Sequence, residues 1–177
     1  MKINWNHIKV KELAAVVSKK LREKDIDAIL VGGACVSIYT TNKYVSYDLD
    51  FVSHTQLKNI TPALLELGFK RGGSRYFIRA DCPFFIEFVS PPVAIGNKPV
   101  KKINEIKTRF GTIVLLSPTD CVKDRLAAFY HWNDPQALEQ ALMVAKAQRI
   151  NLKEIKVWSE QEGYKEKYAV FIKKIMG

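Results

Sequence analysis

The fold is decided by two stretches of the sequence, Ala28-Ile29-Leu30-Val31-Gly32-Gly33 and Tyr47-Asp48-Leu49-Asp50-Phe51-Val52. The first is an apolar run that stops at two glycines, which is typical of a short buried strand followed by a tight turn. Residues 34–39 then predict a helix, and residues 49–52 predict a second strand. Because side chains alternate between the two faces of a strand, Asp48 and Asp50 share one face, with their Cα atoms roughly 6.6 Å apart.

These residues offer the two parts of a phosphate-handling site. Gly32 and Gly33 lack a Cβ atom, so a phosphate can come close to the backbone, and the N-terminus of a helix that begins there favours an anion. Two neighbouring carboxylates repel each other, and a divalent cation relieves the repulsion while it bridges to phosphate oxygens. The stretch from Gly32 to Asp50 therefore predicts a site for a nucleoside triphosphate such as ATP, with Mg²⁺ or Mn²⁺ held by Asp48 and Asp50.

A third carboxylate is expected from a later strand. Residues 74–79 and 84–89 predict an antiparallel pair joined by a turn at 80–83, and Glu87 stands among apolar residues of the second strand. A charge in such surroundings is costly to bury unless it is paired or coordinated. We therefore predict that Glu87 completes the metal site, and an ion pair with Arg75, Arg79 or another nearby base is the alternative.

The rest of the sequence is typical of an α/β (α+β) protein. The elements expected outside the site are helices at 10–21 and 56–67, strands at 105–108 and 112–116, and an irregular crossing segment at 96–99. After Ser117 the apolar spacing becomes helical, with Thr119 or Asp120 expected to cap the first helix and Asn133 or Asp134 the second. We divide the chain into a core of residues 1–117 and a helical region of residues 118–177 packed on it.

The chain has 177 residues, and 28 Lys and Arg against 18 Asp and Glu give it a net charge of +10. This excess biases the protein toward polyanions such as RNA. Part of it lies in a basic segment, made up of Lys98, Lys101, Lys102, Lys107 and Arg109. Because no apolar run approaches the roughly 20 residues of a membrane span and Met1–Trp5 does not start a secretory signal, we expect a cytoplasmic protein without a membrane partner.

The ordered motifs Val31-Gly32-Gly33, Tyr47-Asp48-Leu49-Asp50-Phe51 and Ile86-Glu87-Phe88 resemble the polymerase-beta-like nucleotidyltransferase superfamily. The arrangement looks most like the small bacterial nucleotidyltransferase-fold proteins related to abortive-infection and toxin–antitoxin enzymes, and the resemblance covers residues 26–132. It implies a nucleotidyltransferase fold, in which a mixed twisted sheet with flanking helices is followed by a C-terminal helical bundle.

The resemblance also implies roles for further residues. The family often has Ser directly after the two glycines, where its hydroxyl touches the triphosphate, whereas this chain has Ala34. Ser37, one helical turn later, is the nearest hydroxyl, and we include it with Gly32 and Gly33 as a nucleotide-binding residue. Lys123, on the first helix after the core, is expected to neutralise phosphate charge, with an ion pair to Asp120 or Asp124 as the alternative.

The function implied is a metal-dependent nucleotidyltransferase that moves a nucleoside monophosphate from a nucleoside triphosphate to a hydroxyl acceptor. RNA such as a tRNA end is the preferred acceptor because the chain is basic, and a protein hydroxyl or an aminoglycoside is the alternative. A role as a toxin of a toxin–antitoxin or phage-defence system, with a cognate antitoxin protein as partner, is compatible with this chemistry. The rival from another class is a catalytically weak or inactive nucleotide- or RNA-binding module that keeps the fold.

Overall fold

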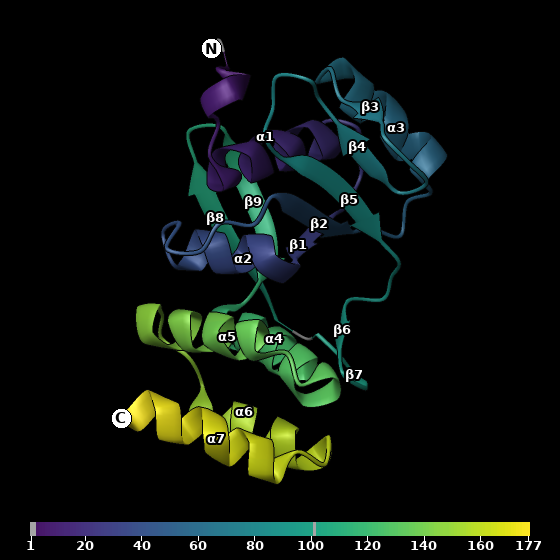
Figure 1. The fold of residues 1–177 in the computed structure, drawn as a ribbon. Coiled ribbons are helices and arrows are strands. Elements are labelled where there is room, and N and C mark those ends of the chain that lie inside the picture. The colour runs from purple at the N-terminus through teal and green to yellow at the C-terminus, as the bar shows by residue number, and fades with distance from the viewer. Residues whose placement is uncertain (1–2, 101) are drawn as a thin grey trace.

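The computed structural model describes residues 3–100 and 102–177 and contains a single large mixed sheet among its described residues (Figure 1). The helices are η1 (Trp5–His7), α1 (Val10–Arg22), α2 (Gly32–Tyr39), α3 (Leu57–Glu66), α4 (Pro118–Trp132), α5 (Pro135–Ala147), α6 (Leu152–Gln161) and α7 (Lys165–Met176). The strands are β1 (Ile29–Val31), β2 (Asp48–Val52), β3 (Lys70–Arg71), β4 (Tyr76–Ile78), β5 (Phe85–Val89), β6 (Ala94–Ile95), β7 (Lys98–Pro99), β8 (Ile103–Thr108) and β9 (Gly111–Leu116).

Seven strands form the large sheet in the order β3-β4-β5-β2-β1-β9-β8. The pairs β2–β5 and β1–β9 are parallel, and the other four pairs are antiparallel. The predicted antiparallel pair is confirmed as β4 and β5. This topology matters for function because it makes β1, β2 and β5 neighbours, and these are the strands that carry the predicted motifs.

The alternation of apolar side chains explains why the sheet forms where it does. Leu49 and Phe51 of β2 are fully buried, as is Leu30 of β1. Helix α1 buries its apolar stripe, which includes Leu13 and Val17, while its lysines stay at the surface or only partly covered. Burying one such side chain contributes about 1.5–3 kcal/mol, so this shared core holds strands and helices in a defined arrangement.

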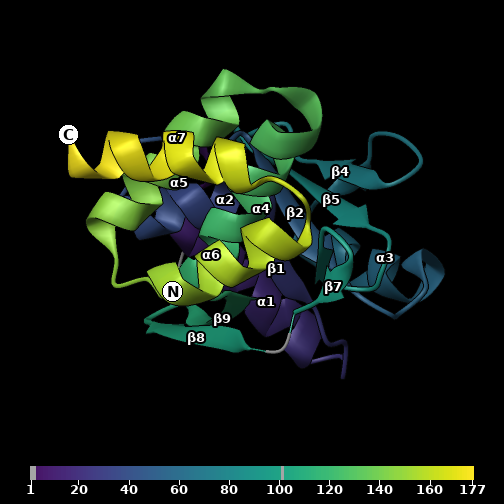
Figure 2. The same cartoon turned by 90° about the horizontal axis from the view of Figure 1, so that it is seen from below.

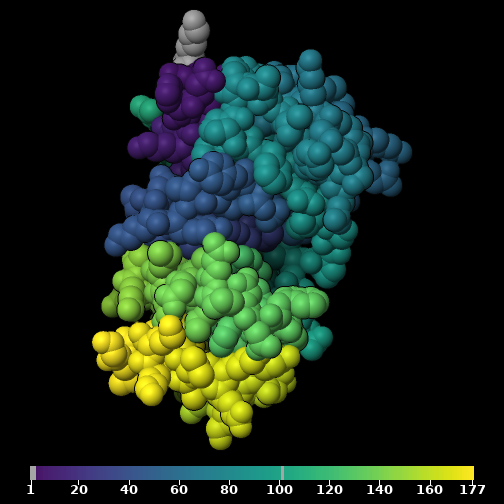
Figure 3. Space-filling model, viewed as in Figure 1, coloured from purple at the N-terminus to yellow at the C-terminus, as the bar shows by residue number. Residues whose placement is uncertain are grey.

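The C-terminal helices extend the fold in layers. Helices α4 and α5 lie between α2 and the pair α6–α7, and the space-filling view shows the same succession from the core to the C-terminal helices (Figures 1 and 3). The division into regions 1–117 and 118–177 stays a prediction. Within the described residues, no helix combines the length and the apolar composition needed to cross a bilayer.

Helix N-termini explain where the C-terminal helices begin. Ser117 caps α4, because its hydroxyl accepts a hydrogen bond from the Asp120 amide at 3.1 Å; the expectation of Thr119 or Asp120 is wrong. A serine directly before Pro118 is well placed for this role, since proline suits the first helical position. Asp134 caps α5 as predicted, and its carboxylate accepts from the amides of Gln136 and Ala137.

The prediction of an irregular crossing segment at residues 96–99 is wrong. These residues lie in the hairpin β6–β7, which packs on α6. The Asn97 amide donates to the Glu162 carboxylate at 3.1 Å, and the Trp158 indole N–H donates to the Ile95 carbonyl at 3.4 Å. These partners lie far away in the sequence, which is why local composition did not predict the hairpin. Lys101, a member of the basic segment, lies outside the described residues.

Candidate active site

The register of the sheet brings the three predicted acids onto one face. Asp50 of β2 lies opposite Val31 of β1 on one side and opposite Glu87 of β5 on the other. Asp48 points the same way because it lies two residues before Asp50 on the same strand. Leu49, between the two aspartates, is fully buried on the opposite face. Acids from two segments of the sequence thus lie in one row beside the strand that leads into the glycine turn.

The glycine turn is in direct contact with this row. Gly32 has a φ of +69°, and a Cβ atom built on it would lie 2.6 Å from the Oδ2 atom of Asp50. Helix α2 begins at Gly32, two residues earlier than predicted, so both glycines belong to its first turn. The backbone of the first turn of α2 therefore lies against the Asp50 carboxylate.

Ser46 connects the turn to Asp48, and sequence reasoning missed it. Its hydroxyl donates to the Oδ1 atom of Asp48 at 2.6 Å, and its backbone N–H donates to the Ser37 hydroxyl at 2.8 Å. A Cβ atom on Gly33 would lie 2.7 Å from the Ser46 hydroxyl oxygen. Its place just before the Asp48 strand is the one signal in the sequence that pointed to this residue.

The structure corrects the expectation for Ser37. Its side chain is fully buried, and its hydroxyl donates to the Gly33 carbonyl at 3.3 Å while it accepts from Ser46. Both capacities of the hydroxyl are used inside the fold. Ser37 therefore holds the turn in place, and we leave it out of the proposed nucleotide contacts.

The electrostatics of the row centre on Asp50. Burial raises the pKa of Asp50 to about 7, and the negative charges of Asp48 and Glu87 act in the same direction. The Arg125 guanidinium acts in the opposite direction. A carboxyl that is partly desolvated and faces two other acids resists ionisation, so the site holds an excess of negative charge that a cation would relieve.

The three acids do not form a preassembled metal cluster. In residues 3–100 and 102–177, no three His, Cys, Asp or Glu side chains gather closely enough to hold an ion together. Asp48 is engaged by Ser46, and Glu87 lies 3.7 Å from the Arg75 guanidinium. Asp48 and Glu87 are thus each drawn toward a neighbour of their own, although all three acids share one face of the sheet.

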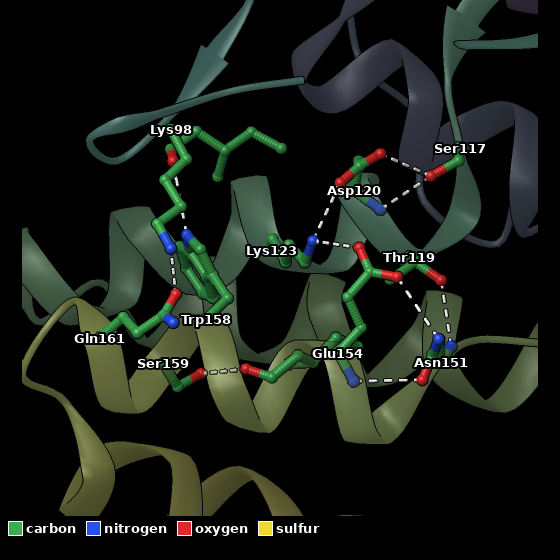
Figure 4. Close-up of polar contacts among 12 residues, drawn as sticks. Lys98, Ser117, Thr119, Asp120, Lys123, Asn151, Glu154, Trp158, Ser159 and Gln161 are labelled. Carbon is green, nitrogen blue, oxygen red and sulfur yellow. Dashed lines mark hydrogen bonds and ion pairs between the residues drawn. The ribbon is translucent and has the colours of Figure 1, made fainter. Parts of the chain in front are cut away.

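Lys123 forms ion pairs with Asp120 of its own helix and with Glu154, and the second pair joins α4 to α6 (Figure 4). Its amino group is 3.2 Å from Asp120 and 2.5 Å from Glu154, and the residue is only 8% exposed. The alternative weighed for this residue, an ion pair with Asp120, is therefore present. The structure assigns Lys123 to holding the helices together.

Arg125 is a basic residue of α4 whose positive charge lowers the pKa of Asp50. Two residues along an α-helix are separated by about 200° around its axis, so Arg125 projects from the side of α4 opposite Lys123. Its guanidinium pairs with Asp124 at 2.5 Å and donates to Gln140 at 3.3 Å. Burial lowers the pKa of Arg125, but the charge and the hydrogen bond of Asp124 raise it above its ordinary value, so this residue stays cationic.

The raised pKa of Asp50 predicts a pH-dependent stability. Because the folded pKa of about 7 is above the ordinary 3.8, the protonated carboxyl favours the fold. This stabilisation is fully present below about pH 4 and is lost as the pH rises through 7. In EDTA, we expect the free energy of unfolding of the native protein to fall by a few kcal/mol over this range relative to Asp50→Asn.

Urea unfolding at several pH values measures this difference. The control is Asp27→Asn, which makes the same change of net charge on an exposed side chain. If native protein and Asp50→Asn show parallel pH profiles, the Asp50 carboxyl is not held in the desolvated, acid-flanked position described above.

Comparison with known proteins supports the fold. No family profile and no curated protein matches this chain. Among solved structures, an antigenic nucleotidyltransferase-like protein from Paracoccidioides brasiliensis is similar, with a TM-score of 0.58, 16% identity, and coverage of 77% of this chain and 75% of that chain. At such identity the likeness concerns the fold alone.

Two structures of the antibiotic-resistance factor ANT(2'')-Ia are similar over nearly the whole chain. The solution structure has a TM-score of 0.55 and 10% identity, and covers 93% of this chain and 91% of that chain. The crystal structure, a complex with adenylyl-2''-tobramycin, has a TM-score of 0.54 and 9% identity, and covers 93% and 97%. The chain therefore has a nucleotidyltransferase fold, which confirms the predicted fold class. The abortive-infection or toxin subtype stays a prediction.

Proposed function

We propose that this protein is a metal-dependent nucleotidyltransferase that moves a nucleoside monophosphate from a nucleoside triphosphate to a hydroxyl acceptor. The observation that carries the proposal is the position of Asp50, which contacts the Gly32 turn and lies in register with Glu87. A triphosphate on the N–H groups of the turn would have its phosphorus atoms beside the acids. Phosphoryl transfer depends on this kind of positioning and charge neutralisation.

Asp48, Asp50 and Glu87 are the residues that would hold Mg²⁺ or Mn²⁺. Their carboxylate oxygens are the hard ligands that these ions take, and the suppressed ionisation of Asp50 reflects the charge that such an ion neutralises. When bound, the ion supplies positive charge that offsets the phosphates. Its binding competes with the Ser46 contact to Asp48 and the Arg75 contact to Glu87, so we expect affinity to depend on both neighbours.

The residues of the chain have separate roles in the transfer. The Gly32-Gly33 turn binds the phosphates. Arg125, whose charge acts on Asp50, takes the phosphate-neutralising role that Lys123 was expected to have, and it exchanges its Asp124 partner for the phosphate to do so. The acceptor oxygen forms a bond to the α-phosphorus, the bond to the bridging oxygen breaks, and pyrophosphate leaves. Glu87 accepts the proton of the acceptor hydroxyl, because it lies one strand farther from the turn than Asp50 and is partly exposed.

RNA such as a tRNA end is the acceptor that the charge supports best, since the chain carries +10. The rival acceptor is a small molecule, because the ANT(2'')-Ia crystal structure is a complex with adenylyl-2''-tobramycin. A toxin role and an antitoxin partner remain part of this proposal. The rival function is a binding module without catalysis. Two observations favour it: Ala34 lacks a hydroxyl, and Asp48 and Glu87 are engaged by separate neighbours.

The proposal is tested by label transfer. We expect the protein to transfer α-phosphate label from one of ATP, CTP, GTP or UTP to total tRNA when Mg²⁺ or Mn²⁺ is present and not in EDTA. A parallel assay offers tobramycin instead of tRNA. Binding of a nucleoside triphosphate without transfer to either acceptor identifies the module, and the absence of both binding and transfer contradicts the proposed function.

A further inference from the structure

A pair of aromatic rings flanks the acids on the side away from the glycine turn. Tyr76 of β4 lies opposite Glu87 of β5 in the sheet register, so it continues the row of residues that includes Asp50. Phe85 lies on the same face, two residues before Glu87, and its ring meets that of Tyr76 edge to face with centroids 6.0 Å apart. Tyr76 is 39% exposed, and Phe85 is partly exposed.

Other aromatic side chains of these strands belong to the core. Phe77 is fully buried and Phe88 is 5% exposed, on the opposite face of the sheet. Seen from below, β4 and β5 lie to one side of helices α4–α7 (Figure 2). Because Tyr76 is 39% exposed, a ligand can reach its ring, and the packing of the core does not require an aromatic ring there.

The ring of Tyr76 is held in place by a glycine turn. A Cβ atom on Gly72 or on Gly73 would clash with the ring, so the ring rests directly on the backbone of the turn. The turn itself is held by Arg71, whose guanidinium donates to the carbonyls of Gly73 and Ser74. A side chain seated in this way loses little conformational entropy when a ligand stacks on it.

Basic side chains lie near the ring on the side away from Asp50. Residues 68–80 contain Lys70, Arg71, Arg75 and Arg79. Arg71 donates to the Gly73 and Ser74 carbonyls and Arg79 pairs with Asp81 at 2.6 Å, so Arg75 and Lys70 are the cations to consider for a ligand. Arg75 is half exposed and lies 3.7 Å from Glu87, and Lys70 lies in register with Ile78 at the exposed end of β4. Exposed aromatic rings among basic side chains are the combination that binds single-stranded RNA, in which bases stack on the rings and phosphates contact the cations.

Building on the proposed function, we propose that Tyr76, supported by Phe85, receives the terminal base of a single-stranded RNA whose ribose hydroxyl is the acceptor. Tyr76 is one strand spacing, roughly 5 Å, from Glu87. Since the base is attached directly to the ribose, a base stacked on Tyr76 places the ribose hydroxyl beside Glu87.

The test removes the ring and the base separately. A fluorescently labelled single-stranded RNA that ends in C-C-A is compared by anisotropy with the same RNA lacking its terminal base. We expect the native protein and Tyr76→Phe to bind the intact RNA about tenfold more tightly, the effect of one stacked base. Tyr76→Ala should bind both RNAs equally. The matched control is Phe110→Ala. Phe110 is a partly exposed ring that lies 4.6 Å from the Arg109 guanidinium, and it follows β8, the strand at the opposite edge of the sheet.

The outcomes separate this inference from the proposed function. Equal binding of both RNAs by the native protein, or loss of discrimination in Phe110→Ala as in Tyr76→Ala, overturns the role of Tyr76. Transfer of label to tRNA that is unchanged in folded Tyr76→Ala overturns it as well, while the transferase proposal survives. If the native protein distinguishes the two RNAs but transfers no label, the RNA site at Tyr76 is supported and only the transferase proposal is contradicted.

Discussion

Asp50→Asn is expected to lower the rate of label transfer by a factor on the order of 10²–10³, the range typical for loss of a group that stabilises developing charge. The amide keeps the size of the side chain but removes the charge at the place where the glycine turn and the acid row meet. In the native protein, burial and the neighbouring acids raise the pKa of the Asp50 carboxyl to about 7. The substitution removes this unfavourable carboxyl. We therefore expect a variant that is less active but, at neutral pH without metal, more stable.

This combination makes the experiment informative. A simple structural defect would lower stability and activity together, whereas a functional acid kept in an unfavourable environment separates the two. Transfer rates and urea unfolding are measured on the same preparations, with Asp27→Asn as the exposed control. Transfer at the native rate by Asp50→Asn would remove the acid row from the mechanism, and a loss of stability at pH 7 would contradict the electrostatic account.

Gly32→Ala is expected to lower both stability and transfer. The added Cβ atom would lie 2.6 Å from the Asp50 carboxylate oxygen, and the φ of +69° is unfavourable for any residue with a Cβ. Either the turn or the carboxylate must shift. We expect a loss of about 1–3 kcal/mol in the free energy of unfolding and at least a hundredfold slower transfer, because small misplacements at a reacting centre are costly.

The control for Gly32→Ala is Gly163→Ala. Gly163 has a φ of +84°, and no atom lies within 4 Å of a Cβ built on it, so this variant has the backbone strain without the contact. We expect Gly163→Ala to lose stability but to keep its transfer rate. Equal transfer rates in the two variants, measured with the folded fraction taken into account, would show that contact between the turn and Asp50 does not matter for activity.

Several features of the site followed from short-range patterns. The apolar strand before Gly32, the alternation around Asp48 and Asp50, and the isolated charge of Glu87 in an apolar strand each depend on backbone geometry within a few residues. The register of β2 with β5 then places these acids on one face. Their roles in binding a metal and a nucleotide stay predictions.

Side-chain partners were beyond local patterns. Lys123 and Arg125 are both basic and lie on the same helix, and the sequence did not show which one faces the acids. Their directions differ because two residues are separated by about 200° around a helix, and the packing of α4 against α6 decides which side is covered. Ser37 was misread for a similar reason, because its hydroxyl is used by Ser46 from the loop before β2.

The sequence by itself determined the class of fold and the segments that carry the candidate site, because periodicity, glycine turns and apolar runs are properties of neighbouring residues. Only the tertiary structure decided that Asp50 lies against Gly32, that Arg125 acts on its charge while Lys123 pairs with Glu154, and that Tyr76 continues the row beyond Glu87. These are distances between segments far apart in the chain, and they are set by strand order and core packing, which no local pattern specifies.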